Sequence, residues 1–311
     1  MGSDECLAQL RYRRLIFGIH HQVLWVGATP QLAPLEPPRA PLASPPTFTI
    51  GTFNIRYATA SDGANAWEHR RAMVTSLLHD GDFWGLQEAL PTQVTELKTA
   101  CPEFDVVVRT RELDAASGEA CPIFFRSSKW TIDPKEQGTF WLSLTPDIAG
   151  SKSWDSSLPR ICTFARFSER RVADAAGVAR SIYIFNVHFD HQGATARLES
   201  AKLIMQRIAA RTHNDPVVLL GDFNTGPTSE PIALITNSTT PRLIDVWKAL
   251  HPTEPEQGTF NGWAEKCGNS RIDFIFASAG LTPASCDIDL TKPNGRWPSD
   301  HAAVRATMKF R

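Results

Sequence analysis

The sequence predicts a layered α/β or α+β domain. Short β-type runs dominate the chain from residue 47 onward, and helical patterns lie between some of them. Several of the runs are continuously apolar, as expected for strands that are buried on both faces or that lie in a sandwich core. We find no internal repeat in the sequence.

The expected strands are spread along the whole of this stretch. In chain order they are residues 48–55, 83–87, 105–108, 123–126, 161–167, 181–187, 217–220, 272–276 and 303–310. The clearest helix covers residues 194–212, where apolar residues recur at helical spacing and charged residues point elsewhere. Its expected core stripe is Leu198, Ala201, Met205 and Ile208. A second helix is expected at residues 67–79, with Met73, Leu77 and Leu78 turned inward.

Composition excludes several protein classes. The chain has 311 residues, of which 42% are hydrophobic and 21% are charged, close to globular averages. No apolar run approaches the roughly 18 residues of a membrane-spanning helix, and collagen and wholesale disorder are excluded as well. The formal net charge of −1 excludes a strong positive bias of the kind that holds duplex nucleic acid, although a local basic groove is still compatible with it.

The first 46 residues differ from the rest of the chain. Prolines crowd residues 30–46, which is typical of a linker or an extended arm. Residues 11–28 partly imitate a secretory signal, and the first residues partly imitate a myristoylation motif, but both patterns are imperfect. We therefore expect a poorly ordered or extended leader at residues 1–46 and a single domain at residues 47–311. A cytoplasmic location is favoured over secretion.

The cysteines do not form a recognisable metal motif. The sequence has six of them, far apart, with no CxxC or CxxH pair that would indicate zinc. Cys121 and Cys162 lie in apolar runs, so we expect them to be small core residues.

Polar residues that can bind a metal or move a proton follow the expected strands repeatedly. Asn54 closes the first strand and Glu88 follows the second. Taken singly, Asn54 could be a turn former and Glu88 a surface ion-pair partner. After the strand at residues 181–187, His188, Asp190 and His191 crowd together, and zinc binding by these three is conceivable although no fourth ligand has a suitable spacing.

The later strands carry further candidates. Asp222 and Asn224 follow four aliphatic residues and lie on the same side of the emerging chain, although a plain Asx turn would also explain them. Asp273 opens one apolar strand, and the pair Asp300 and His301 opens the last. A carboxylate that accepts a hydrogen bond from an imidazole fixes the tautomer of the ring and raises its pKa. Such a histidine is suited to stabilising negative charge.

In this order, the five groups of residues resemble the exonuclease/endonuclease/phosphatase superfamily. That group contains pancreatic deoxyribonuclease, the abasic-site endonucleases, the neutral sphingomyelinases, the inositol polyphosphate 5-phosphatases and the carbon catabolite repressor type deadenylases. The resemblance covers residues 48–310 and rests on the ordered motif set. It implies a four-layered sandwich of two packed mixed β-sheets flanked by helices, and metal-assisted hydrolysis of a phosphoester.

The resemblance also implies roles for individual residues. The magnesium site would be formed by Asn54, Glu88 and Asp300, with Mn²⁺ as a substitute for Mg²⁺. The catalytic set would be Asp222, which orients and deprotonates water, Asn224 as its positioning partner, His301 braced by Asp273, and His188 on the opposite side. In-line attack on phosphorus depends mainly on such positioning and on electrostatic stabilisation.

One position departs from the nuclease pattern. Many nuclease members have an acidic residue two positions after the strand-end asparagine, where this chain has Arg56. An arginine there disfavours a second metal and could grip a substrate phosphate. The segments at residues 56–70 and 158–162 are similar to a branch of hydrolases near the deadenylases. The signature motifs of the inositol 5-phosphatases are absent.

Other residues are candidates for binding the rest of the substrate. Trp263 lies on a polar, glycine-bearing loop, where it could stack on a base or sugar or simply cover the loop. The complete set of substrate-binding candidates is Arg56, Arg160, Asp190, Trp263 and Arg271. Solvated surface arginines are the commoner case for any one of the three arginines.

Three functional hypotheses follow. The first is a magnesium-dependent phosphodiesterase or nuclease-type enzyme that acts on nucleotide or RNA 3′ ends in the manner of a 3′–5′ exonuclease. The second is a phosphatase of a small metabolite or lipid headgroup, which suits the near-neutral charge and Arg56. The third is an inactive binding module, because a fold does not imply a function. The complete catalytic set argues against this third hypothesis, and the sequence does not indicate an oligomeric state.

Overall fold

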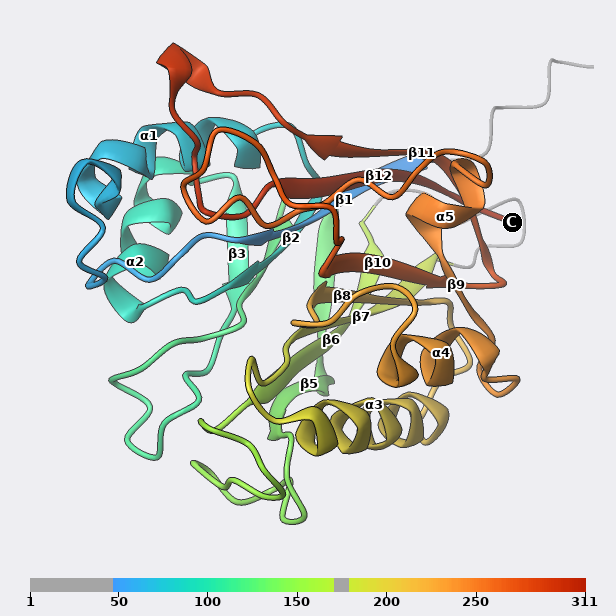
Figure 1. Cartoon of the computed structure of the whole chain (residues 1–311). Coiled ribbons are helices and arrows are strands. Elements are labelled where there is room, and N and C mark those ends of the chain that lie inside the picture. The colour runs from blue at the N-terminus through green and yellow to red at the C-terminus, as the bar shows by residue number, and fades with distance from the viewer. Residues whose placement is uncertain (1–46, 171–178) are drawn as a thin grey trace, which may run out of the picture. The chain divides into compact units, whose positions relative to one another are not determined.

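The computed structural model describes residues 47–170 and 179–311, which form two β-sheets with helices on their outer faces (Figure 1). The expectations for residues 1–46 lie outside the described residues, as does Cys6. The first sheet has six strands in the order β11-β12-β1-β2-β4-β3, and the second has six in the order β5-β6-β7-β8-β10-β9. The strands of the first sheet are β1 (Thr47–Asn54), β2 (Phe83–Gln87), β3 (Phe104–Val107), β4 (Ile123–Arg126), β11 (Leu281–Asp289) and β12 (Ala303–Phe310). Those of the second are β5 (Trp130–Trp141), β6 (Ile161–Glu169), β7 (Ser181–His188), β8 (Val217–Asp222), β9 (Leu243–Asp245) and β10 (Asp273–Ser278). The α-helices are α1 (Trp67–Leu78), α2 (Pro91–Ala100), α3 (Ala194–Ala209), α4 (Glu230–Asn237) and α5 (Val246–Leu250).

Three apolar cores hold the layers together. The central core lies between the sheets, where Phe48 and Phe83 of the first sheet meet Ile184 and Leu220 of the second. A second core packs the outer face of the first sheet against α1 and α2, and a third packs the outer face of the second sheet against α3 and α4. The expected four-layered sandwich of two mixed sheets is therefore confirmed (Figure 1).

All the strands expected from the sequence are present, but three others were missed. The missed strands β5, β9 and β11 lack continuous apolar runs: β5 and β11 are edge strands with a register shift and a proline, and β9 has only three residues. Edge strands tolerate proline and exposed residues because one of their sides makes no ladder hydrogen bonds. Apolar patterning alone cannot find them.

The buried faces of helices α1 and α3 are rotated relative to the faces predicted from the sequence. In α3, Ala201, Met205 and Ile208 are buried as predicted, but Leu198 is only half-buried and Ile204 is fully buried. In α1, Met73 and Leu77 are half-buried, contrary to the prediction. The buried residues of α1 are Trp67, Arg70, Val74 and Leu78. The inward face of α1 thus contains an arginine, which an apolar pattern excludes.

The cysteines and the helix lengths agree with the sequence analysis. Cys121 and Cys162 are buried core residues, and the five cysteines in the part of the chain that the structure describes are free. Over residues 47–170 and 179–311, no helix is long and apolar enough to cross a membrane.

A buried polar contact joins the two sheets near the carboxyl ends of their central strands. Asn186 of β7 donates from Nδ2 to the carbonyl oxygens of Leu86 (2.8 Å) and Pro122 (2.9 Å), and its Oδ1 accepts from Gln87 Nε2 at 2.7 Å. Gly85 makes room for this contact, because a Cβ there would lie 2.8 Å from the Asn186 side chain. These bonds fix how β2 and β7 face each other.

Arg70 ties the segment that follows β1 to the segment that precedes β12. Its side chain is 1% exposed, and Nη1 donates to the carbonyl oxygens of Ile55 (2.9 Å) and Pro298 (2.8 Å). The Trp263 ring packs against the guanidinium, with its centroid 5.1 Å away. Burial lowers the pKa of Arg70 to about 10, so the group stays charged near neutral pH. Arg70 therefore anchors the chain just after β1 to the segment that precedes Asp300.

Asp190 organises a second loop pair. Its carboxylate is buried and accepts backbone hydrogen bonds from Ser157 (3.0 Å), Gln192 (3.0 Å) and Gly193 (2.7 Å). Burial alone would raise the pKa of Asp190, but the bonds from Gly193 and Ser157 outweigh it and lower the pKa well below its ordinary value. The prediction that Asp190 contacts substrate is not supported by this placement, because both carboxylate oxygens are used by the loops.

We predict that Arg70→Met lowers the free energy of unfolding by about 2 to 4 kcal/mol, because the carbonyl oxygens of Ile55 and Pro298 lose their donors in a buried place. The matched control is its neighbour Arg71→Met, whose half-exposed side chain pairs with Glu96 at the surface. That control should change stability by less than about 1 kcal/mol. Urea unfolding followed by circular dichroism measures both, and equal losses would contradict the anchoring role.

We predict that Asp190→Asn destabilises the protein by about 1 to 3 kcal/mol at pH 7. The pKa of Asp190 is depressed in the folded state, so its contribution is complete above the unfolded pKa of about 3.9 and is lost as pH falls through the folded value. The gap in unfolding free energy between wild type and variant should therefore shrink below pH 4. A difference in unfolding free energy that stays constant from pH 7 to pH 3 would refute this account. The control variant is Asp147→Asn, whose carboxylate is exposed.

Candidate active site

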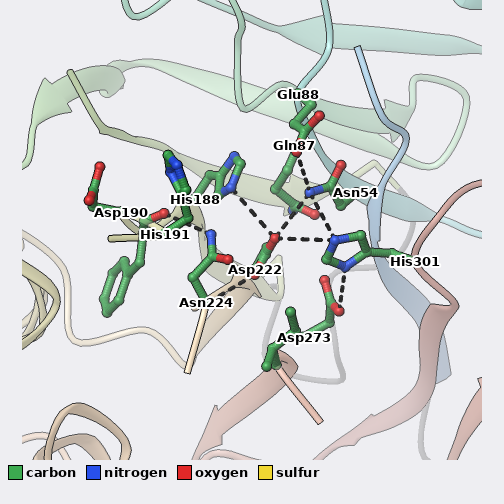
Figure 2. Close-up of polar contacts among 12 residues, drawn as sticks. Asn54, Gln87, Glu88, His188, Asp190, His191, Asp222, Asn224, Asp273 and His301 are labelled. Carbon is green, nitrogen blue, oxygen red and sulfur yellow. Dashed lines mark hydrogen bonds and ion pairs between the residues drawn. The ribbon is translucent and has the colours of Figure 1, made fainter. Parts of the chain in front are cut away.

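Strand register brings the polar residues at the strand ends together. Asn54 pairs with Gln87 across the parallel strands β1 and β2, and His188 pairs with Asp222 across the parallel strands β7 and β8. Asp273, the first residue of β10, pairs with Asp222 across an antiparallel ladder. Figure 2 shows these side chains gathered at one point between the two sheets.

Asp222 lies at the centre of this cluster. Its side chain is fully buried, and Oδ2 accepts a hydrogen bond from Asn54 Nδ2 at 3.0 Å (Figure 2). The same oxygen lies 3.5 Å from His188 Nε2 and 3.7 Å from His301 Nε2. Burial and the nearby Asp273 raise the pKa of Asp222, while His301 and Asn54 oppose that rise. The carboxylate is thus poised between its charged and neutral forms.

His301 is held by a second carboxylate. Its Nδ1 lies 2.9 Å from Asp273 Oδ2, which leaves Nε2 facing Asp222 (Figure 2). Burial would lower the pKa of His301, but Asp273 and Asp222 together raise it above its ordinary value. Asp273 is itself fixed at the start of β10, where its backbone N–H donates to Thr259 Oγ1 at 3.2 Å. His301 therefore favours the imidazolium form.

His188 has the opposite electrostatic surroundings. Burial, followed by the positive charges of Arg160 and Arg111, lowers the pKa of His188 well below its ordinary value. The ring is therefore neutral near pH 7. Asp222 thus lies between one neutral and one protonated histidine.

The turn after β8 is strained in a way that fixes two candidates. Gly221 has a φ of 146°, and a Cβ there would lie 2.1 Å from the carbonyl oxygen of Val187, so only glycine fits directly before Asp222. Asn224 has a φ of 49°, and its backbone N–H donates to Asp222 Oδ1 at 2.8 Å. The Asx turn that the sequence allowed is therefore present, and it orients the carboxylate.

Glu88 and Asp300 line the cleft and offer carboxylate ligands, and Asn54 is buried beside Glu88. Asn54 Nδ2 donates to Glu88 Oε1 at 3.0 Å, and the other oxygen of Glu88 accepts the Tyr57 backbone N–H at 3.2 Å. The Oδ1 of Asn54 accepts the Arg56 N–H at 3.0 Å, which leaves it a second lone pair. Two carboxylates and one amide oxygen are the hard donors that Mg²⁺ prefers.

A second group can also hold a metal ion. Asp222, Asp273 and His301 each offer a ligand atom, and these atoms lie within 4.8 Å of one another. In the structure, however, the Nδ1 of His301 is already engaged by Asp273. Binding a cation at this group would require His301 to be neutral.

Arg56 is placed at the cleft, but with an acidic partner. Its backbone has a φ of 56°, a strained value for a residue other than glycine. Its Nε and Nη2 bond to both oxygens of Asp62 at 3.0 and 3.1 Å, and Nε lies 3.8 Å from Asp300 Oδ2. The bond to Asp62 raises the pKa of Arg56 further. A substrate phosphate would share this arginine with Asp62.

Arg160 also lines the cleft. The residues around it do not support the hypothesis that His188, Asp190 and His191 bind zinc. Arg160 is 4% exposed, and its Nη2 lies 2.9 Å from His191 Nδ1. The carboxylate of Asp190 points away from Asp222 and is used by loop hydrogen bonds (Figure 2). His188, Asp190 and His191 therefore do not converge on one point.

Two predicted substrate contacts lie elsewhere. Arg271 is fully buried, where it bonds to Asp245 at 2.7 Å and to Glu256 at 3.2 Å. It is a structural ion pair outside the cleft rather than a phosphate ligand, because its donors face these carboxylates. Trp263 does not line the cleft either, since its ring covers Arg70.

The cleft contains residues that the sequence analysis missed. Its volume is about 620 Å³, and the missed residues in its lining include Tyr57, Arg111, Glu119 and Phe260. His191, which the sequence analysis considered only as a zinc ligand, also lines the cleft. Phe260 belongs to the same loop as Trp263, but it is Phe260 whose ring packs edge-on against His301 at a centroid distance of 5.0 Å. A bridge between the backbones of Phe260 and His301 sets that contact, which loop composition alone cannot indicate.

Comparison with known proteins gives consistent results. A crystal structure of an endonuclease/exonuclease/phosphatase from Bacteroides vulgatus is 32% identical, with a TM-score of 0.76 over 86% of this chain and 100% of that one. A mannosyl-6-phosphatase from Bacteroides thetaiotaomicron is also 32% identical, with a TM-score of 0.72 over 85% of this chain and 100% of that one.

A viral relative and a family model extend the comparison. The uncharacterized protein L388 of Acanthamoeba polyphaga mimivirus is 28% identical over 169 residues, which are 51% of this chain and 59% of the viral protein. The model of the Endonuclease/Exonuclease/phosphatase family matches residues 51–301, a range that includes the whole cluster around Asp222. The chain therefore belongs to the Endonuclease/Exonuclease/phosphatase family.

Proposed function

We propose that this protein is a divalent-metal-dependent phosphomonoesterase that releases phosphate from a small metabolite. The observation that carries the proposal is the buried Asp222 carboxylate, bonded to Asn54 and flanked by His188 and His301 within one cleft. A carboxylate with a raised pKa is suited to accept a proton from water. One neutral and one protonated histidine border the place where a phosphoryl group would lie.

In the proposed reaction, water attacks phosphorus and the bond to the alcohol oxygen breaks. Asp222 orients the water and accepts its proton, and Asn224 keeps the carboxylate in place through its N–H. The imidazolium of His301, braced by Asp273, donates to the phosphoryl oxygens as their negative charge grows. Neutral His188 donates from the opposite side. The leaving alcohol oxygen takes up a proton from solvent, and Asp222 then returns its proton to solvent. The products are inorganic phosphate and the free alcohol.

Asn54, Glu88 and Asp300 would hold the cation in this proposal. A bound Mg²⁺, or Mn²⁺ in its place, would withdraw charge from the phosphoryl oxygens. Asn54 connects this ligand group to Asp222, since its Nδ2 donates to both Glu88 and Asp222 at 3.0 Å. The Asn54 amide therefore fixes the position of the Asp222 carboxylate relative to that of Glu88.

The dimensions and charges of the cleft support a small substrate. A volume of about 620 Å³ lies within the range of sites for metabolites. The three described arginines that line it, Arg56, Arg111 and Arg160, each have a carboxylate partner, so none forms part of a free basic track along a nucleic-acid backbone. The full-length similarity to a mannosyl-6-phosphatase supports the same substrate class.

Nucleotide or RNA 3′ ends remain a second candidate. Phe260 supports it, because this ring is 44% exposed and lies beside His301, where it could stack on a base. The two candidates differ in salt dependence. Hydrolysis of an oligonucleotide held by several phosphate contacts would weaken steeply as salt rises, whereas hydrolysis of a small phosphomonoester would respond little.

We predict that Asp222→Asn lowers kcat for a phosphomonoester by about 10²- to 10⁴-fold, because an amide cannot accept the water proton. Removing divalent cations with a chelator should abolish turnover in the wild type, and Mg²⁺ should restore it. Phosphate release from a panel of sugar phosphates, nucleotides and oligo-RNA measures both effects. Asp80→Asn, whose carboxylate is exposed outside the cleft, is the control. Full activity of folded Asp222→Asn would refute the assignment.

A further inference from the structure

One wall of the cleft is built from residues that the proposed reaction does not use. We call it the far wall and define it as Arg111, Glu119, Arg160 and His191, all of which line the same cleft as Asp222. Arg111 Nη1 donates to Glu119 Oε2 at 2.8 Å, and Arg160 Nη2 lies 2.9 Å from His191 Nδ1. The two pairs place guanidinium, carboxylate and imidazole groups along one surface.

The fold holds the far wall rigidly beside the strand ends. Ala120 pairs with Thr110 and with Ala89, the residue after Glu88, so Glu119 is fixed next to the end of β2. The Arg111 N–H also donates to the Glu119 carbonyl oxygen at 2.8 Å. On the other side, Asp190 lies 3.4 Å from Arg160 Nε, which gives the buried carboxylate a role in orienting this arginine.

Unused hydrogen-bonding capacity remains on the far wall. Arg160 is 4% exposed, yet its Nη1 makes no hydrogen bond within the described residues. Arg111 is 8% exposed, and its buried Nε makes none either, although it lies 3.5 Å from Glu112 Oε1. Glu119 accepts a bond at Oε2 from Arg111, and its side chain is 16% exposed at the cleft. Two unpartnered, buried guanidinium nitrogens and a partly exposed carboxylate therefore belong to the same wall of the cleft.

The charges of the far wall indicate what it can bind. Arg111 is balanced by Glu119, and Arg160 by Asp190, so the wall has no excess positive charge for a second phosphate. The Glu119 carboxylate would repel an anion directly. A hydroxyl group both donates and accepts, so adjacent hydroxyls can bond to a carboxylate and a guanidinium at the same time.

We propose that the far wall is a hydroxyl-binding subsite that receives the sugar ring of a phosphorylated monosaccharide, with Glu119 accepting from adjacent hydroxyls and Arg111 or Arg160 donating to them. This inference rests on the proposed phosphomonoesterase activity and names its substrate class. The phosphate lies at Asp222 and His301, and the ring extends across the same cleft to the far wall.

The test compares two substrates that differ only in what the far wall would bind. Glucose 6-phosphate carries the ring hydroxyls, and cyclohexylmethyl phosphate has a ring of similar size without them. Phosphate release is measured for wild type, Glu119→Gln and the control Glu265→Gln, whose residue is exposed and outside the lining of the cleft. Adenosine 5′-monophosphate is a third substrate, because its ribose also carries adjacent hydroxyls.

For glucose 6-phosphate, we expect Glu119→Gln to lower kcat/KM by about 10- to 100-fold, mostly through KM, because a charged hydrogen bond to substrate is lost. Cyclohexylmethyl phosphate should change by less than about 3-fold, and the control should change neither substrate. A comparable dependence of adenosine 5′-monophosphate on Glu119 would support the subsite and identify ribose as the source of the hydroxyls.

Two other outcomes are distinguishable. Equal kcat/KM of the wild type for glucose 6-phosphate and cyclohexylmethyl phosphate would overturn the subsite, and this comparison does not depend on whether the variant folds. An equal loss for both substrates in Glu119→Gln would also overturn it, since Glu119 would then act on the reacting phosphate. If the wild type hydrolyses no phosphomonoester, the proposed function itself fails.

Discussion

The structure depends on keeping one carboxylate, Asp222, buried between two sheets. A buried carboxylate without partners is costly, and here its partners come from both sheets: Asn54 from β1, His188 from β7 and His301 from just before β12. These contacts exist only if the central strands of both sheets end at the same place. The apolar core packs the two sheets against each other, while the bonds of Asn186 to the first sheet fix the relative position of those ends.

The surroundings of Asp222 are asymmetric in charge. His301 has Asp273 behind it and favours the protonated form, whereas burial, together with the charges of Arg160 and Arg111, lowers the pKa of His188 and keeps it neutral. Two histidines in one cleft are thus given different properties by the residues behind them. Arg160 also belongs to the far wall, so the group proposed to recognise the substrate contributes to the charge state of a proposed catalytic residue. Substrate recognition and chemistry are then coupled through electrostatics.

Much of this site could be predicted from the sequence because its polar residues lie directly beside the ends of apolar strands. Asn54, Asp222 and Asp273 were found in that way, and the strand register brings them together. The predicted substrate contacts Arg271 and Trp263 do not line the cleft, because burial and pairing are tertiary properties. Nothing in the sequence around Arg271 reveals that Asp245 lies within 2.7 Å. Likewise, Glu119 comes to the cleft through a bridge between Ala120 and Ala89, which no local pattern encodes.

The central claim is that the cation lies at Asn54, Glu88 and Asp300, which leaves Asp222 free to act as a base. The most direct test is a crystal structure with bound Mn²⁺, in which the anomalous scattering of the metal locates it. We predict one strong peak about 2.1 Å from a carboxylate oxygen of Glu88, with the Asp273 and His301 pair intact. A single peak bound by Asp222, Asp273 and His301, the other group able to hold a metal, would contradict the account.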